Sequence, residues 1–199
     1  MSVILLFTDF YNYFQVASLQ DISDIKIGFP GQPEEEGNLL FLQVRQFNDD
    51  GNIIPNSADY TKLDEKSGSH LLKEGDVLFV GKGNRLFAWC YKETTTPTVA
   101  SSSFFVLRPD TNRVHPEYLA AYLNAPQTKA AFQQLGAGTN IFSIRKSELG
   151  AFQIPLLSME MQQKVAALAY LHQKEVQLAK EIIDQKQILY KSIIYKLIK

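Results

Sequence analysis

Two patterns of hydrophobic and polar residues divide the chain of 199 residues. Short apolar runs separated by glycine, proline and acidic stretches occupy roughly the first 110 residues, which is typical of β-strands joined by turns. After this point the apolar residues recur at helical spacing, and residues 158–199 contain neither glycine nor proline. We therefore predict an α+β fold, in which a β-rich domain with short helices precedes a long C-terminal helix.

Turn signals bound the expected strands of the first part. Residues 16–25 suit either a short helix or an irregular start of a strand, and Gly28–Asn38, with its prolines, glycines and glutamates, is a surface loop. The expected strands are 39–47, 77–81, 85–91 as the hairpin partner of 77–81, and 98–109, which Pro109 ends. A lysine, Lys82, stands where the run 77–81 ends.

Two short helices are predicted next. Tyr118, Leu119, Tyr122 and Leu123 stand at helical spacing, and Pro116 lies near a helix start, where its missing N–H costs nothing. A second short helix follows Pro126. Residues 136–155 then read as a glycine-rich loop, a short apolar piece, a turn and a strand that ends at Pro155.

Residues 158–199 predict a single helix of about forty residues, with Ser158 as its N-cap and no capping box. Its apolar stripe consists of Val165, Leu168, Leu171, Leu178, Ile182, Leu189, Ile193 and Leu197. A helix of this length cannot bury such a stripe against itself, so we expect a coiled coil with a second helix or a second chain. The predicted domains are residues 1–156 and the pairing helix 157–199.

Charge is unevenly distributed along the chain. The formal net charge is −1, which alone argues against a general nucleic-acid binder. Residues 1–70 hold 4 basic against 11 acidic side chains, residues 71–150 hold 9 against 6, and residues 151–199 hold 7 against 4. If one surface faces a polyanion, we expect the middle of the chain to supply it.

The stretch LLKEGDVLFVGKGN, residues 71–84, tests a nucleotide-binding interpretation. It lacks the Gly-Lys-Ser/Thr ending of a phosphate-binding P-loop, and Leu86 stands where a dinucleotide-binding loop has its third glycine. Turn geometry explains Gly81 and Gly83 but not the cationic Lys82 and Arg85 beside them.

No catalytic constellation is found, so we expect neither a cofactor, nor a metal, nor an enzymatic activity. His70, His115 and His172 are scattered without a metal-ligand spacing, and Asp64–Lys66 suits a solvated loop better than a pair of catalytic carboxylates. Cys90, the single cysteine, has no adjoining histidine and reads as a small buried hydrophobe. No signal peptide or membrane span is evident, which indicates a cytoplasmic, folded protein.

Five segments follow one another in the second part of the chain: LLKEGDVLFVGKG, with a Leu-x-x-Gly-Asp-hydrophobic pattern; SSSFFVLRP; VHPEYLAAYLN; GTNIFSIRKSELGAFQIPL; and MQQKVAALAYL. In this order they resemble the specificity subunits of type I restriction-modification systems. The likeness spans residues 71–199. Two departures are a single copy of a unit that the family repeats, and LLSMEMQQ where the family has a proline pair followed by Glu-Gln.

The resemblance implies a target recognition domain that binds one half of a bipartite site in double-stranded DNA. It also implies assembly with methyltransferase and restriction subunits, and a single copy implies a half subunit that forms a homodimer, or a truncated or recombining variant. Expected phosphate contacts are Lys82, Arg85, Arg145 and Lys146, and expected base contacts are Asn84, Thr139, Asn140 and Ser143, with Arg45 and Gln46 as further candidates. The alternative is a protein-interaction adaptor that uses the helix for assembly, which the acidic N-terminal third favours.

Overall fold

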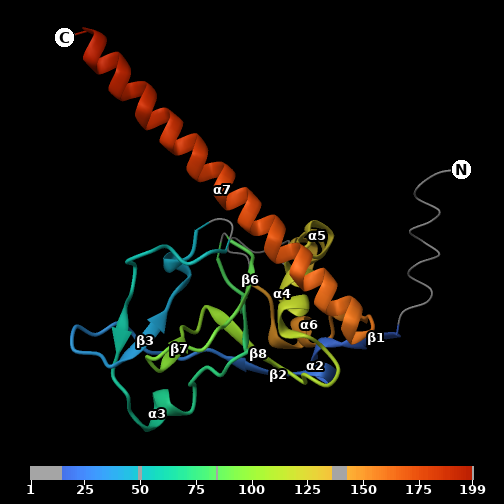
Figure 1. The fold of residues 1–199 in the computed structure, drawn as a ribbon. Helices are drawn as coiled ribbons and strands as arrows, with labels where there is room; N and C mark the ends of the chain where they lie inside the picture. Colours follow the sequence, from blue (N-terminus) through green and yellow to red (C-terminus); the bar gives the residue numbers. More distant parts are fainter. Residues whose placement is uncertain (1–14, 49–50, 84, 136–142, 199) are drawn as a thin grey trace, which may run out of the picture. The chain divides into compact units, whose positions relative to one another are not determined.

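The computed structural model describes residues 15–48, 51–83, 85–135 and 143–198 (Figure 1). The chain divides into two compact units, residues 1–163 and 164–199. The predicted α+β class is confirmed: small sheets and short helices form the first unit, and helix α7 (Met159–Ile198) begins there and continues as the second. The functional assignment of residues 1–156 and 157–199 stays a prediction.

A four-stranded antiparallel sheet forms the centre of the first unit. Its order is β2 (Ser23–Ile27), β8 (Phe104–Pro109), β5 (Val77–Val80) and β6 (Ala88–Cys90). Every residue of β5 is buried, as an apolar run in an inner strand requires. The predicted hairpin is confirmed, because Val77 pairs with Cys90 and Phe79 with Ala88.

A second sheet has three strands in the order β4 (Tyr60–Thr61), β3 (Leu39–Leu42) and β7 (Thr98–Ala100). Strand β3 pairs antiparallel with β4 and parallel with β7, so β3 and β7 end at the same edge. Phe47 packs edge-on against Trp89 and Phe104, which connects the segment after β3 to the central sheet.

Three predicted strands were too long: 85–91 contains only β6 (Ala88–Cys90), and the other two are interrupted. Residues 39–47 are not one strand, because β3 ends at Leu42 and a 3-10 helix, η1 (Val44–Gln46), follows, closed by a bond from Gln43 N to the Gln46 side chain. Residues 98–109 are two strands in different sheets. They are separated at Ser101–Ser103, where Phe104 N turns back to Ser101 O at 3.0 Å.

The predicted helices are confirmed as α4 (Pro116–Asn124), α5 (Pro126–Leu135) and α7. The ambiguous segment 16–25 contains β1 (Gln15–Ser18), α2 (Leu19–Ile22) and most of β2. The turn expected before the last strand is a short helix, α6 (Lys146–Gly150), and that strand is β9 (Gln153–Leu156), paired with β1. The segment Asp64–Lys66, expected in a loop, lies at the start of a short helix, α3 (Glu65–Gly68). The Asp64 carboxylate caps this helix and accepts from Ser67 N at 2.6 Å.

Helix α4 covers an edge of the central sheet. The Asn124 amide accepts from Ala88 N at 3.0 Å and donates to Ala88 O at 2.7 Å, so it takes the place of a neighbouring strand at the start of β6. Tyr118 on the same helix donates its hydroxyl to Pro155 O at 2.7 Å, which joins α4 to β9. The edge of the central sheet is thereby covered at Ala88 by the Asn124 side chain rather than by another strand.

Candidate nucleic-acid interface

Segments from four parts of the chain meet at one edge of the first unit. Ser101 N donates to Leu42 O at 2.8 Å, Gly81 N donates to Ser103 O at 3.1 Å, and Ile144 N donates to Gly81 O at 2.9 Å. We use the term rim for the segments that these main-chain bonds join, which are 42–47, 81–83 with Arg85, 101–103 and 143–146. Predicted DNA-binding residues from distant parts of the sequence are thus brought together.

The turn Gly81–Gly83 needs glycine at both of its ends. A side chain at Gly81 would collide with the ring of Phe105, and Gly83 has a φ of 109°, which favours glycine. The loop is closed by Val80 N, which donates to Phe87 O at 3.0 Å, and Lys82 pairs with Ser143 in an isolated antiparallel bridge. The turn therefore projects Lys82 from the rim and is not a phosphate-binding loop before a helix.

Lys82, Arg145 and Lys146 are exposed on the rim. Within the described ranges, none of their side chains forms an ion pair. Arg145 N donates to the Glu148 carboxylate at 2.7 Å, so Glu148 caps α6 through the main chain and leaves the guanidinium to solvent. Three solvated cations near one another form a local positive surface on a chain whose net charge is −1.

Other predicted contact residues are engaged inside the rim. The Arg45 guanidinium binds Asp59 through Nη2 at 2.6 Å and Nε at 3.1 Å, and the buried Gln46 amide donates to the same carboxylate at 3.1 Å. Arg85 donates to the carbonyls of Val44 and Phe47. These three side chains hold the segment 43–47 in place, and their contact with DNA stays a prediction.

The remaining predicted base contacts are only partly described. Ser143 is half-buried beside Lys82, whereas Asn84, Thr139 and Asn140 lie outside the described residues. Sequence reasoning missed the serines at 101–103, because a single predicted strand covered them. The signal was present as three consecutive turn-favouring residues between two apolar runs.

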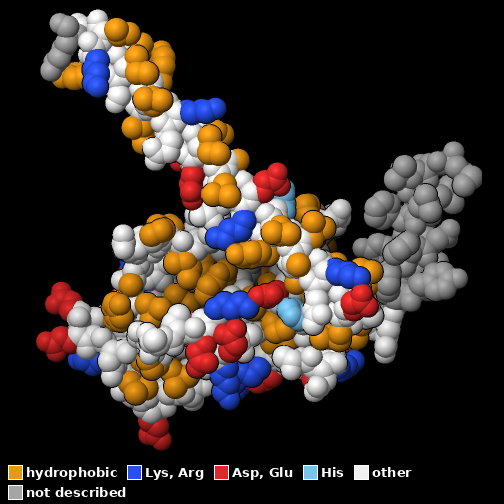
Figure 2. Space-filling model, viewed as in Figure 1, with side chains coloured by type: hydrophobic (Ala, Val, Ile, Leu, Met, Phe, Trp, Pro, Cys, Tyr) orange, Lys and Arg blue, Asp and Glu red, His pale blue; other side chains and the backbone are white. Residues whose placement is uncertain are grey.

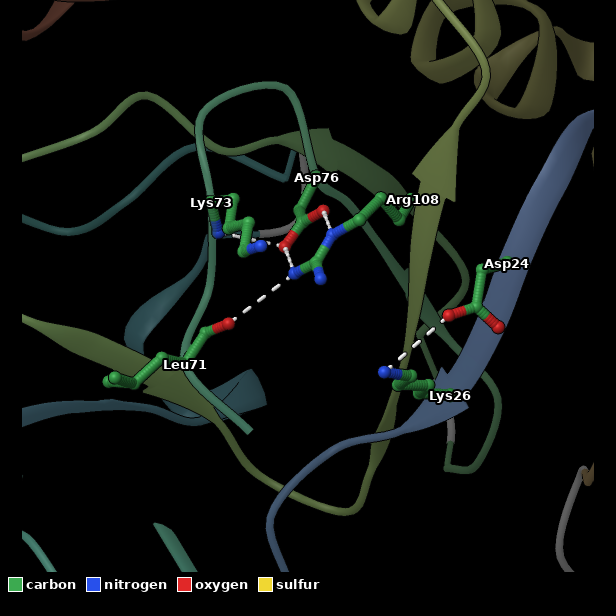
Figure 3. A network of polar contacts seen from close by, with 6 residues as sticks. All are labelled: Asp24, Lys26, Leu71, Lys73, Asp76 and Arg108. Atoms are coloured by element: carbon green, nitrogen blue, oxygen red, sulfur yellow. Dashed lines mark hydrogen bonds and ion pairs between the residues drawn. The ribbon is translucent and has the colours of Figure 1, made fainter. Parts of the chain in front are cut away.

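An ion pair supports the strands that end at the rim (Figure 3). Asp76, 1% exposed, accepts from Arg108 Nε at 2.8 Å and Nη2 at 2.7 Å, and from Lys73 N at 2.8 Å. The bond to Asp76 raises the pKa of Arg108 above its usual value. Gly75 has a φ of 82°, so the Lys-Glu-Gly-Asp stretch is a turn whose aspartate locks β5 to β8.

A buried glutamine fixes the first turn of α7 within the first unit. Gln162, fully buried, accepts from His115 N at 2.7 Å and donates to Arg113 O at 3.1 Å and Leu157 O at 2.9 Å. Ser158 is the N-cap as predicted, since Met161 N donates to its hydroxyl at 3.3 Å. The glutamine in the segment MQQKVAALAYL therefore has a definite structural function.

The second unit carries the predicted apolar stripe. Figure 2 shows hydrophobic side chains at the surface of this helix. Val165 is half-buried, and the other stripe residues are between 47% and 76% exposed: Leu168, Leu171, Leu178, Ile182, Leu189, Ile193 and Leu197. An apolar row of this length is the usual seam of a helix pair.

No helix among the residues that the structure describes combines the length and hydropathy needed to cross a membrane. No group of histidine, cysteine and carboxylate side chains is arranged there to hold a metal ion.

Known structures share this arrangement of a β-rich unit and a long helix. The HsdS subunit from Thermoanaerobacter tengcongensis matches with a TM-score of 0.56 and 21% identity, over 85% of this chain and 39% of that chain. The type I restriction-modification S subunit from M. genitalium matches with a TM-score of 0.58 and 15% identity, over 87% of this chain and 43% of that one. The chain has the fold of these S subunits.

A third match has a TM-score of 0.57 and 19% identity over 90% of this chain and 46% of that chain, in a structure concerned with complex assembly and conformational transition of the type I restriction-modification system. The chain spans less than half the length of each of these three. No protein-family model and no curated protein matches its sequence. The predicted resemblance to type I S subunits is confirmed as a structural match, with one S-subunit-like unit and one long helix present.

Proposed function

We propose that this protein is a non-catalytic DNA-recognition subunit, which binds one half of a bipartite duplex target through its rim. The proposal depends on one observation: Lys82, Arg145 and Lys146 are exposed, and in the described part of the chain they form no ion pair, on a fold shared with S subunits. Cations placed in this way contact phosphates, which positions a protein on DNA, and polar side chains between them contact base edges. Ser143 is the described candidate for a base contact.

The apolar stripe of α7 supports a second part of the proposal. We propose that the stripe pairs with a second copy of the chain, so that two rims address the two halves of a target. Methyltransferase and restriction subunits then supply the chemistry, as the resemblance to type I systems suggests. In each of the three matches this chain covers less than half of the matched chain, which is consistent with a half subunit that pairs.

A gel-shift titration on a random-sequence duplex tests DNA binding. The affinity is expected to fall steeply as salt rises from about 50 to 200 mM, because each phosphate contact adds about 0.9 to the slope of log K against log salt. The three rim cations that are unpaired among the described residues predict a slope near −3 for one rim. Absence of binding at low salt would contradict the proposal and favour the protein-adaptor alternative.

Light scattering of the purified protein tests the pairing of α7. A dimer has about 45 kDa, twice the 22.5 kDa of one chain. Ile182→Asp, in the middle of the stripe, is expected to give the monomer mass. Gln177→Asp is the matched control, since it lies about 140° around the same helix and should keep the dimer. A wild-type monomer would mean that the stripe binds a different subunit.

A further inference from the structure

The turn Ser101–Ser103 is a rigid part of the rim. Ser101 N is bonded to Leu42 O at 2.8 Å, Phe104 N to Ser101 O at 3.0 Å, and Gly81 N to Ser103 O at 3.1 Å. The main chain of this turn is therefore fixed by the end of β3, by the start of β8 and by the Gly81–Gly83 turn.

A fourth contact comes from the loop after β2. Phe29 N donates to Ala100 O at 2.7 Å, and a side chain at Gly28 would collide with the carbonyl oxygen of Ser101. Glycine at position 28 thus allows the loop to lie directly against the turn. A turn held on several sides loses little further entropy when it binds a ligand.

The serine side chains of the turn, in contrast to its main chain, do not stabilise the fold through hydrogen bonds among the described residues. Ser102 is exposed and Ser101 and Ser103 are half-buried. Across the part of the chain that the structure describes, none of their three hydroxyls makes a hydrogen bond, whereas Ser57, Ser67 and Ser69 each donate to a carbonyl. The turn presents a row of available hydroxyl donors next to the cationic Lys82.

We propose that the hydroxyls of Ser102 and Ser103 contact phosphate oxygens on the DNA strand that Lys82 neutralises. The inference rests on the proposed function and adds to it a neutral positioning element. Hydroxyl groups are common phosphate ligands, and they fix the register of a protein on the duplex without specifying sequence. Because they carry no charge, they contribute affinity without releasing counterions.

Paired substitutions test this assignment in gel shifts on two random-sequence duplexes of different composition. Ser102→Ala with Ser103→Ala is expected to weaken binding about 3- to 10-fold on both duplexes with an unchanged salt slope. Ser102→Glu is expected to weaken it at least about 10-fold, because a carboxylate would face phosphate. Thr95→Glu is the matched control: Thr95 is exposed in the loop before β7, at the far end of the strand that leads to the turn, and should change affinity less than about 2-fold.

The outcomes separate the two proposals. Wild-type binding with no loss in the serine variants overturns this inference alone, and a loss confined to one duplex indicates a base contact instead of a phosphate contact. Absence of wild-type binding overturns the proposed function and this inference together. Thermal unfolding of each variant shows whether an affinity change reflects misfolding.

A footprint gives a second readout that does not depend on a disruptive charge. In S102C the introduced thiol should be alkylated by iodoacetamide more slowly when the duplex is present, and in T95C the rate should not change. Cys90, the single native cysteine, adds little background because burial raises its pKa to about 11. Equal alkylation rates of S102C with and without a bound duplex would rule out the contact.

Discussion

Asp76 and Arg108 form a two-point ion pair that joins the turn before β5 to β8, with Oδ1–Nε and Oδ2–Nη2 distances of 2.8 and 2.7 Å. The carboxylate is 1% exposed and also accepts from Lys73 N, whereas the Arg108 side chain is 34% exposed. Arg108→Met keeps an unbranched apolar stem but removes the guanidinium, so it leaves Asp76 as a buried charge without its cation. We expect the free energy of unfolding to fall by about 3 kcal/mol in urea denaturation.

A neighbouring ion pair provides the control for that measurement. Lys26 Nζ lies 3.5 Å from Asp24 Oδ2, and the two side chains are 54% and 59% exposed, respectively (Figure 3). Lys26→Met should change the free energy of unfolding by less than about 1 kcal/mol, because solvent screens such pairs. Equal effects of the two substitutions would show that burial of Asp76 is not what makes its ion pair important.

Gln162 is expected to be a strong determinant of stability. Gln162→Ala removes the partners of His115 N, Arg113 O and Leu157 O at a fully buried position, and unpartnered buried polar groups are costly. We expect a loss of about 3 kcal/mol in chemical denaturation. Gln163→Ala, at the exposed next position of the helix, should be neutral within about 0.5 kcal/mol, and a comparable loss there would contradict the interpretation.

Loss of a lysine in the rim should weaken DNA binding more than loss of an exposed lysine elsewhere on the first unit. Lys82→Ala and Lys146→Ala are each expected to weaken duplex binding and to reduce the salt slope by about 0.9. Lys66→Ala is the control: Lys66 is exposed on α3, which follows β4, and β4 pairs with the opposite end of β3 from the rim. Salt titrations with the same duplex measure the slopes, and an unchanged slope for Lys82→Ala would exclude its phosphate contact.

Cys90 should react slowly with alkylating reagents. Burial raises the pKa of its thiol from 9.0 to about 11, so near pH 8 its thiolate population is about 100-fold smaller than that of an ordinary thiol. Because folding raises this pKa, the protonated thiol stabilises the folded state. This stabilisation is fully present below pH 9.0 and is lost as the pH rises toward about 11. Alkylation rates followed from pH 7 to 11 by mass spectrometry check this, and a midpoint near 9 would refute it.

The sequence predicted the helical part well because its signals are local. Pro116 at a helix start, the absence of glycine and proline after Ser158, and the apolar spacing of the last helix all act within a few turns of chain. The strands of the first unit were harder to predict from the sequence. An apolar run such as 98–109 does not show that its halves join different sheets, since this depends on partners far away in sequence, such as Leu42 for Ser101.

At the candidate site, too, local signals could be predicted from the sequence and long-range contacts could not. Basic residues after strands indicated a rim, and the structure brings Lys82 beside Ser143. The sequence could not show that Arg45 is neutralised by Asp59, or that Arg85 donates to the carbonyls of Val44 and Phe47. Whether an arginine faces solvent or its own main chain is decided by tertiary contacts, which leave no trace in local composition.

The segments of the rim are held to one another by amide and carbonyl groups, from Leu42 through Ser101–Ser103 and Gly81 to Ile144. Amide and carbonyl groups stay the same whichever side chain a position carries. A substitution at Ser102, Lys82 or Ser143 therefore changes a side chain of the proposed interface and leaves the main-chain scaffold under it assembled. If the rim binds DNA as proposed, we expect its target preference to evolve by single substitutions at base-contacting positions such as Ser143, without loss of the fold.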